Sequence, residues 1–241
     1  MRQMRWCRGA AAGIETPMPT HIRVTAGSGG VATITLARPE KKNALSIALR
    51  DEVSDALDAL GCDAAVKAIV ITGAADVFCA GFDLREFREL ADPAGARRLW
   101  DSSDRFHHAV LACPLPTIAA VNGPALAGGF DLAILCDLRI AATTASFAHP
   151  EIAFGDVVYG PLHELVGGAV ARELALTGRS VGAAEALALR LVSAVVPPAD
   201  LHAEVERWTT QILQAPRELL LRTKQKIMRR SGAHPPATLD L

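Results

Sequence analysis

The sequence predicts an α/β fold, and three observations carry this prediction. Apolar runs of strand length, such as residues 65–72 and 116–121, alternate with segments in which apolar residues recur at helical spacing. The segment after Gly155 shows mainly helical spacing. Half of the 241 residues are apolar, so the chain can bury a large core. No fixed-period repeat or low-complexity linker divides the sequence, which predicts a single domain over residues 20–241.

A hairpin and a helix are expected first. Residues 21–25 and 31–36 alternate between apolar and polar positions and flank the tetrapeptide GSGG, which predicts a β-hairpin. From Ser46 to Leu60, leucine and valine recur at helical spacing with acidic residues on the other face. This spacing predicts an amphipathic helix.

Three apolar segments then predict buried strands. Residues 65–72 form an apolar run closed by Gly73, as in a strand that is covered on both faces. The elements expected next are a helix over 93–112, a strand over 116–121, a helix from Gly128 and a strand over 138–142. Their spacing suits right-handed crossovers between parallel strands.

Helical patterns fill the remainder of the chain. The expected helices span residues 162–175, 183–189, 199–214 and 217–230. The predicted domain therefore has a core over 20–196 and a helical region over 197–232. Residues 1–19 end in two prolines and lack the apolar core of a secretory signal, so a disordered leader is expected.

Charge and cysteine content exclude several classes of protein. Lys and Arg number 25 against 26 Asp and Glu, a net charge of −1, which leaves no strong field to hold nucleic acid or an anionic membrane. No apolar run approaches the length of a membrane span. The five cysteines are widely spaced without a C-x-x-C pair. Reduced, buried thiols in a cytoplasmic protein are expected.

Familiar catalytic motifs are incomplete. The glycines of 123–130 lack the Gly-Lys-Ser/Thr ending of a phosphate-binding loop, and no G-x-S-x-G occurs. His163 begins a pattern like a zinc helix, but Gly167 stands where the second histidine belongs. His107 and His108 are neighbours, so their side chains diverge on a helix. We expect the residues of these incomplete motifs to be solvated helix positions.

Two glycine-marked turns stand out instead. Residues 78–84, FCAGFDL, follow the strand that ends at Thr72, and residues 120–131 follow the strand over 116–121. The second turn opens a helix, whose free N–H groups can hold negative charge. Two such donors facing one oxygen make an oxyanion hole. For either turn alone, tight packing between strand and helix is the simpler explanation.

Taken together, the turns resemble those of the crotonase superfamily, the enoyl-CoA hydratase/isomerase family. The similarity runs from about residue 21 to 230 and is carried by 38–45, 78–83, 118–131, 136–141 and 176–179. The resemblance implies a crotonase-like spiral of ββα units with a helical C-terminal region. It also implies an acyl-CoA thioester substrate and assembly as a homo-trimer or hexamer. No metal or redox cofactor is implied, because coenzyme A is part of the substrate.

The resemblance also assigns site residues by position. The backbone N–H groups of Phe82 and Gly128 would form the oxyanion hole, and Glu151 and Asp131 would be the two catalytic acids. The residues implied in CoA or substrate binding are Lys42, Ala80, Phe82, Asp83, Leu84, Arg85 and Gly128.

The two acids also have explanations that need no catalysis. Glu151 lies in an apolar region after a buried strand, where a solvated charge is unexpected, yet a loop carboxylate bonded to nearby N–H groups fits as well. Asp131 in the first turn of a helix stabilises the helix dipole. Aspartate is also shorter than the family's glutamate by one carbon–carbon bond, roughly 1.5 Å. Two further departures are a loop over 155–165 shorter than is usual in the family and a short segment after Arg230.

The function expected is hydration of a 2-enoyl-CoA to a 3-hydroxyacyl-CoA, which needs proton transfer and a polarised carbonyl. One alternative is a double-bond isomerase that uses Glu151 alone. A second is a member of the dehalogenase branch in which Asp156 takes the role of nucleophile. A third is a catalytically silent CoA-binding subunit. The acyl group and the pathway are not determined by the sequence.

Overall fold

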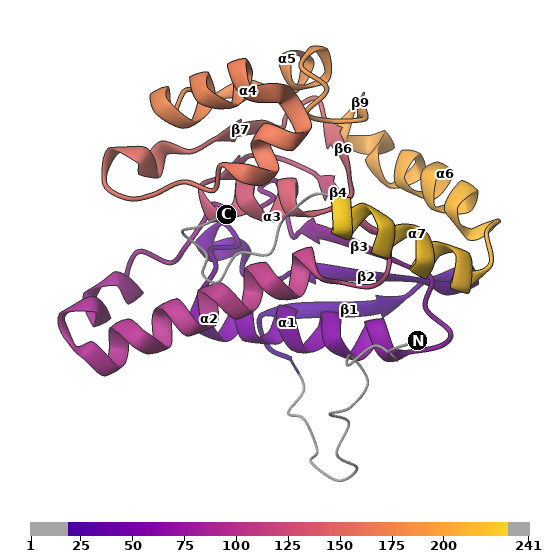
Figure 1. Ribbon diagram of the computed structural model, residues 1–241, viewed down its shortest axis with the longest axis horizontal. Helices are drawn as coiled ribbons and strands as arrows, with labels where there is room; N and C mark the ends of the chain where they lie inside the picture. Colours follow the sequence, from indigo (N-terminus) through magenta and orange to yellow (C-terminus); the bar gives the residue numbers. More distant parts are fainter. Residues whose placement is uncertain (1–18, 231–241) are drawn as a thin grey trace, which may run out of the picture.

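The computed structural model describes residues 19–230, apart from the side chains of residues 28 and 88–90. The predicted leader up to residue 18 and the predicted domain's last residues, 231–241, lie outside the described part. Within it the α/β class is confirmed: a six-stranded sheet and a three-stranded sheet are surrounded by helices (Figure 1).

The larger sheet contains every strand that the sequence predicts. Its order is β1 (Ile22–Ala26), β2 (Val31–Leu36), β3 (Ala68–Gly73), β4 (Thr117–Val121), β6 (Leu138–Ala142) and β9 (Ala194–Val196). β1 and β2 form the expected antiparallel hairpin, and every later pairing is parallel. The smaller sheet joins β5 (Ala125–Leu126), β7 (Ser146–Ala148) and β8 (Val181–Gly182). Sequence periodicity misses these strands and β9, because two or three residues carry no measurable period.

The helices begin and end close to the predicted positions. They are α1 (Ile47–Cys62), α2 (Pro93–Leu111), α3 (Gly128–Leu135), α4 (Gly160–Thr177), α5 (Ala183–Ala188), α6 (Leu201–Leu213) and α7 (Arg217–Arg230). Short 3₁₀ turns add η2 (Ser28–Gly30), η3 (Pro39–Lys41), η4 (Glu86–Ala91), η5 (Pro150–Ala153) and η6 (Pro198–Asp200). The start of α1 is fixed by Ser46, whose side chain accepts a hydrogen bond from the Leu49 N–H, and the start of α2 by Asp92.

Both faces of the parallel sheet are buried. Ile69 and Ile71 belong to the main core that also includes residues of α1, whereas Val70 and Ile118 pack with Leu201 of α6. Side chains alternate between faces along a strand, so a continuous apolar run is what a doubly covered strand requires. In Figure 1, α1 and α2 run side by side along one edge and α6 lies over the opposite part of the sheet.

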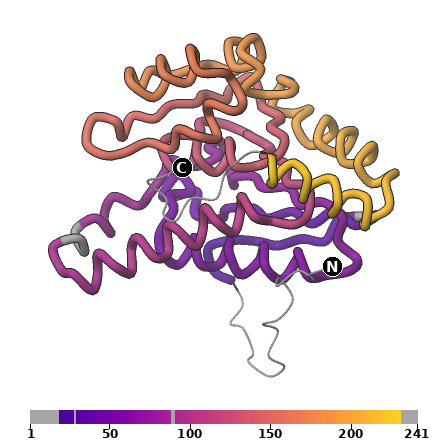
Figure 2. Tube along the Cα trace, in the orientation of Figure 1, coloured from indigo at the N-terminus to yellow at the C-terminus, as the bar shows by residue number. Residues whose placement is uncertain are grey.

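The last helix is tied to the sheet by a buried ion pair. α7 is the yellow end of the tube in Figure 2, and Lys224 Nζ donates to the two carboxylate oxygens of Asp137 at 2.6 and 2.7 Å. Lys224 is 4% exposed, and Asp137 also accepts from the Thr117 N–H at 2.8 Å. The contact joins the C-terminal helix to the start of β4.

We expect Lys224→Ala to lower the free energy of unfolding by about 2–3 kcal/mol, because it leaves the Asp137 carboxylate without its cation. For a chain of this size that corresponds to a fall in Tm of about 5–10 °C, measured by thermal unfolding followed by circular dichroism. Lys226→Ala, on the exposed side of α7, is the control and leaves Tm within about 2 °C. Equal melting temperatures for the two variants would contradict an anchoring role for the pair.

The cysteine prediction is only partly confirmed. Cys79, Cys113 and Cys136 are buried free thiols, but Cys62 at the end of α1 is exposed, and Cys7 lies outside the described residues. Cys62 is the last residue of α1, beyond the apolar spacing that ends at Leu60. Among residues 19–230, no helix has the length and apolar character that crossing a membrane demands.

Candidate active site

The two glycine-marked turns lie against each other, backbone to backbone. The Cys79 N–H donates to the Pro124 carbonyl at 3.1 Å, and the Leu126 N–H donates to the Cys79 carbonyl at 2.9 Å. A Cβ atom added at Gly129 would lie 2.3 Å from the Cys79 carbonyl oxygen, so only glycine allows this approach. The glycines therefore join two turns that are separated by about fifty positions in the sequence.

This packing orients the two predicted donors. The Leu45 N–H donates to the Gly81 carbonyl at 2.8 Å and the Asp83 N–H donates to the Leu45 carbonyl at 3.2 Å. Because backbone groups alternate in direction along an extended segment, the N–H of Phe82 points away from Leu45. Gly128 is the first residue of α3, so its N–H has no acceptor within the helix. A Cβ at Gly81 would lie 3.3 Å from the Gly128 nitrogen, which places the two donor segments in contact.

The residue before Gly128 has a strained backbone. Ala127 has φ 51° and ψ −130°, a conformation that non-glycine residues rarely adopt. Its N–H donates to the Ala148 carbonyl at 2.9 Å, which ties the turn to β7. Strain of this kind persists only where the surroundings enforce it, and it concentrates at functional sites. Here it directs the first turn of α3.

The turns open into a cavity of about 500 Å³. Six of the predicted site residues line it: Ala80, Phe82, Leu84, Gly128, Asp131 and Glu151. Aromatic side chains from two other elements, Phe87 and Trp100, form part of the wall, and their rings meet edge to face with centroids 6.4 Å apart. The loop after η5 also reaches the cavity through Asp156 and its neighbours, although it is short. The cavity is thus largely apolar with its acids at one side.

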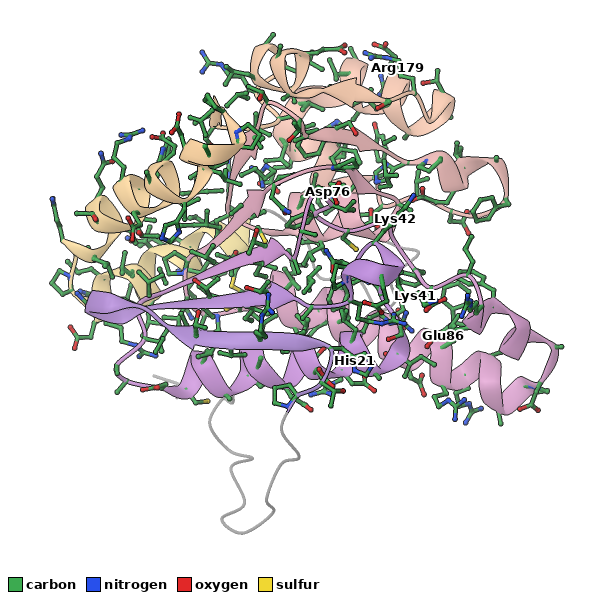
Figure 3. The ribbon with its side chains drawn as sticks, turned by 180° about the vertical axis from the view of Figure 1, so that it is seen from behind. His21, Lys41, Lys42, Asp76, Glu86 and Arg179 are labelled. Atoms are coloured by element: carbon green, nitrogen blue, oxygen red, sulfur yellow. The ribbon has the colours of Figure 1, made fainter. Side chains whose placement is uncertain are left out.

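Three predicted residues lie outside the cavity lining. Lys42 is exposed and has a left-handed backbone, with φ 51°, where η3 ends. Figure 3 shows it on the same side of the molecule as Lys41. Asp83 pairs with Arg38 at 3.1 Å, and Arg85 is exposed. The CoA contacts of Lys42, Asp83 and Arg85 remain predictions.

Glu151 lies on η5 with its carboxyl group partly buried. Its Oε2 is buried and has no hydrogen-bond partner within residues 19–230. Burial raises the pKa of Glu151 to about 7, with a positive His149 opposing the rise and the negative Asp131 adding to it. The carboxyl group is therefore present in both protonation states near neutral pH, which suits a group that accepts and returns a proton.

Asp131 has a different environment. Its Oδ1 lies 2.9 Å from His149 Nε2, and its Oδ2 lies 3.8 Å from His107 Nε2. Burial opposes ionisation, but the neighbouring imidazoles of His107 and His149 hold the pKa of Asp131 below its usual range. The side chain is turned to the histidines, so it does more than complement the dipole of α3. Asp131 is a carboxylate that two imidazoles already engage.

The prediction that His107 is a solvated helix residue is wrong. His107 is 1% exposed, and its Nδ1 donates to the Ser103 carbonyl at 2.8 Å. The adjacent His108 is exposed, so the predicted divergence of the two side chains is confirmed. Helical periodicity assigns one of the two to the buried face. It does not show that this face meets α3.

His149 was given no role by sequence reasoning, although it stands two residues before Glu151. It is 1% exposed, and its ring stacks against Phe130 with centroids 4.5 Å apart. A histidine next to a proline in an apolar segment is the signal that could have drawn notice. Its partner, Asp131, lies eighteen positions away, and the sequence does not show that the two side chains meet.

The acids and His149 also have the proximity of a metal site. One ligand atom from each of Asp131, His149 and Glu151 lies within 4.8 Å of the others. The 2.9 Å contact between Asp131 and His149 is a hydrogen bond between an anionic carboxylate and an imidazole N–H, which explains the spacing without an ion. We assign no metal to these residues.

Comparison with known proteins matches this arrangement to one family. The profile of the enoyl-CoA hydratase/isomerase family matches residues 26–240. A probable enoyl-CoA hydratase of Mycobacterium bovis is 42% identical over 193 residues, which are 76% of this chain and 72% of that protein. The crotonyl-CoA hydratase of Syntrophomonas wolfei is 37% identical over 188 residues, with the same two shares.

Solved structures agree with the sequence comparison. The structure of an enoyl-CoA hydratase/isomerase from Xanthobacter autotrophicus Py2 superposes with a TM-score of 0.81 at 37% identity, covering 88% of this chain and 80% of that one. An enoyl-CoA hydratase from Mycobacterium smegmatis gives a TM-score of 0.82 at 32% identity, covering 89% and 84%. The chain belongs to the enoyl-CoA hydratase/isomerase family and has the crotonase fold, with the predicted helical C-terminal region.

Proposed function

We propose that the protein hydrates a 2-enoyl-CoA thioester to a 3-hydroxyacyl-CoA. The observation that supports this most is Glu151, a partly buried carboxyl group whose pKa of about 7 suits proton transfer, beside a cavity bordered by Phe82 and Gly128. The family relationship supplies the substrate class. Crotonyl-CoA hydratase and enoyl-CoA hydratase are the names that relatives carry.

The proposed reaction needs one group that first accepts and then donates a proton. The Glu151 carboxylate takes a proton from water while the oxygen of that water forms a bond to the β-carbon. The electron pair of the double bond moves toward the thioester carbonyl, where the N–H groups of Phe82 and Gly128 stabilise the oxyanion. The α-carbon then takes the proton from Glu151, which returns to the carboxylate. One water is added and no other reactant is consumed.

Binding and assembly are proposed on the family relationship. The acyl group occupies the cavity beside Ala80 and Leu84, and the CoA portion passes Asp83, Arg85 and Lys42 at the surface. We further propose a homo-trimer or hexamer in the cytoplasm that works without a metal or redox cofactor. The near-neutral net charge of −1 supports the view that nucleic acid and membranes are not partners.

A second candidate activity is migration of a double bond between the 3- and 2-positions. In that reaction Glu151 removes a proton from one carbon and returns it to another, and no water is positioned. Asp131 Oδ1 is hydrogen-bonded to His149, and Oδ2 lies 3.8 Å from His107 Nε2. This favours the second candidate, because less of the carboxylate is free to position a water. Both activities use the same oxyanion hole.

The Asp131→Asn variant tests whether Asp131 positions the attacking water or serves only as the partner of the two histidines. We expect hydration and double-bond migration to fall together, each by less than about 10²-fold, the least that loss of a general acid or base brings. Both rates are measured on one preparation, with melting temperature as the control for folding. A hydration rate reduced by about 10²-fold or more, with migration intact, would show that Asp131 handles the water.

The proposed function itself is tested by incubating the purified protein with 2-enoyl-CoA esters of increasing chain length and with their 3-enoyl isomers. Loss of absorbance by the conjugated thioester and a mass increase of one water identify hydration. Formation of the conjugated product without a mass change identifies isomerisation. If the protein binds CoA esters but turns over neither series, the catalytically silent CoA-binding subunit is the candidate that remains.

A further inference from the structure

A buried charge cluster surrounds Asp131, and the proposed reaction does not use it. His107 on α2 and His149 before η5 approach the two oxygens of Asp131 from different sides. His107 and His149 are each 1% exposed and Asp131 is 6% exposed. Burying a charge is costly unless a partner of opposite charge accompanies it. The three side chains therefore form one unit.

His149 is held by this carboxylate. Asp131 is anionic and can only accept, so the proton in their 2.9 Å hydrogen bond is on His149 Nε2. The other ring nitrogen, Nδ1, is buried and has no hydrogen-bond partner in the described chain. One ring face packs against Phe130. Neither contact replaces the carboxylate in orienting the imidazole.

The two acids of the cavity are thus used in opposite ways. Asp131 has His149 and His107 at its oxygens, whereas Glu151 presents a buried Oε2 without a partner among residues 19–230. We propose that His149 is a positioning residue that keeps Asp131 ionised and engaged, so that Glu151 alone exchanges protons with the substrate. This inference rests on the proposed function, in which Glu151 is the proton-transfer group.

The charges that face Glu151 support this division. Burial alone lowers the pKa of His149, but its hydrogen bond to Asp131 and the charges of both acids raise it above its usual value. Cys79 lies near Asp131 from the first turn, and burial raises its pKa to about 12, so the thiol stays neutral. Asp156 faces the cavity from the loop and is exposed, where water screens its charge. His149 and Asp131 therefore act on the ionisation of Glu151 in opposite directions.

Removing the positive charge of His149 leaves the negative charge of Asp131 to act on Glu151 without opposition. His149→Gln retains a hydrogen-bond donor but leaves the Asp131 charge uncompensated, and a nearby negative charge disfavours ionisation of Glu151. We expect the protonation midpoint of Glu151 to move upward by about one pH unit. The double variant Asp131→Asn/His149→Gln removes both charges and returns the midpoint toward that of the wild type. His108→Gln, an exposed histidine one position after His107, leaves it unchanged.

The measurement is a pH titration by NMR of protein labelled with ¹³C at the glutamate carboxyl carbons. The Glu151 signal is assigned by its loss in Glu151→Gln, and no substrate is present. In parallel, the pH–rate profile of His149→Gln should move in the same direction, with turnover about fivefold lower at pH 7 and recovered at higher pH. A merely structural histidine would lower turnover equally at every pH.

The outcomes are distinguishable. An unchanged Glu151 midpoint in folded His149→Gln overturns the inference. If that variant does not fold, the wild-type histidine signals decide: His149 must remain protonated to higher pH than exposed His108, and an equal or lower midpoint overturns the inference. A Glu151 midpoint that moves while the pH–rate profile stays fixed supports the charge pair and rejects the proposed function.

Discussion

Glu151→Gln lowers turnover of enoyl-CoA esters by about 10²-fold or more, because the amide has the shape of the carboxyl group but cannot accept or return a proton. Binding of a saturated acyl-CoA, measured by calorimetry, persists because the cavity wall is unchanged. The wild-type rate rises with pH through about 7 as Glu151 becomes the carboxylate that starts the reaction. Near-normal turnover in Glu151→Gln would exclude both candidate activities as proposed.

The melting temperature of Glu151→Gln provides an internal control for its loss of activity. Burial raises the pKa of Glu151 in the folded protein above its unfolded value, so its favourable contribution is complete below the unfolded pKa and is lost as the pH rises through about 7. Above that pH the folded protein holds a partly buried carboxylate that the unfolded chain would solvate. Glu151→Gln removes this cost, so the inactive variant should have a higher Tm than the wild type at pH 8. A lower Tm there would indicate a structural role for the carboxylate.

Gly128→Ala lowers kcat by about 10²–10³-fold, the loss expected when an oxyanion donor is displaced. The added Cβ would lie 2.7 and 2.8 Å from two ring carbons of Phe82 and 3.3 Å from a methyl carbon of Leu45. The Phe82 ring is fixed by the Arg50 guanidinium, 4.5 Å from its centroid, so it cannot move freely. Relief of the contact separates the two turns and moves both donors. A displacement of about 1 Å at reacting groups costs about 10²-fold.

Gly182→Ala is the matched control, since a Cβ there meets no atom within 4 Å. Steady-state kinetics and melting temperatures are measured for both glycine variants. Gly128→Pro removes the N–H outright, but its ring meets the same Phe82 contact and restricts the strained Ala127 further. Full activity in folded Gly128→Ala would place the oxyanion hole elsewhere.

The sequence by itself determined the elements whose pattern is local. Strands Val31–Leu36 and Leu138–Ala142 were predicted to the residue, because an alternating pattern or an apolar run bounded by turn residues has few alternatives. Helix α1 followed from the apolar spacing that begins after Ser46. The two glycine turns were also evident, because glycine is needed wherever backbones approach closely.

Only the tertiary structure decided what those elements bring together. Strands β5, β7 and β8 are too short to be recognised and exist because segments distant in the sequence pair with one another. Periodicity shows that one face of α2 is buried, but it cannot show that His107 meets Asp131 there, or that His149 reaches the same carboxylate. These contacts join three separate segments across a common core. Packing between distant segments, not local pattern, thus makes Asp131 an engaged anion and leaves Glu151 Oε2 without a hydrogen-bond partner among residues 19–230.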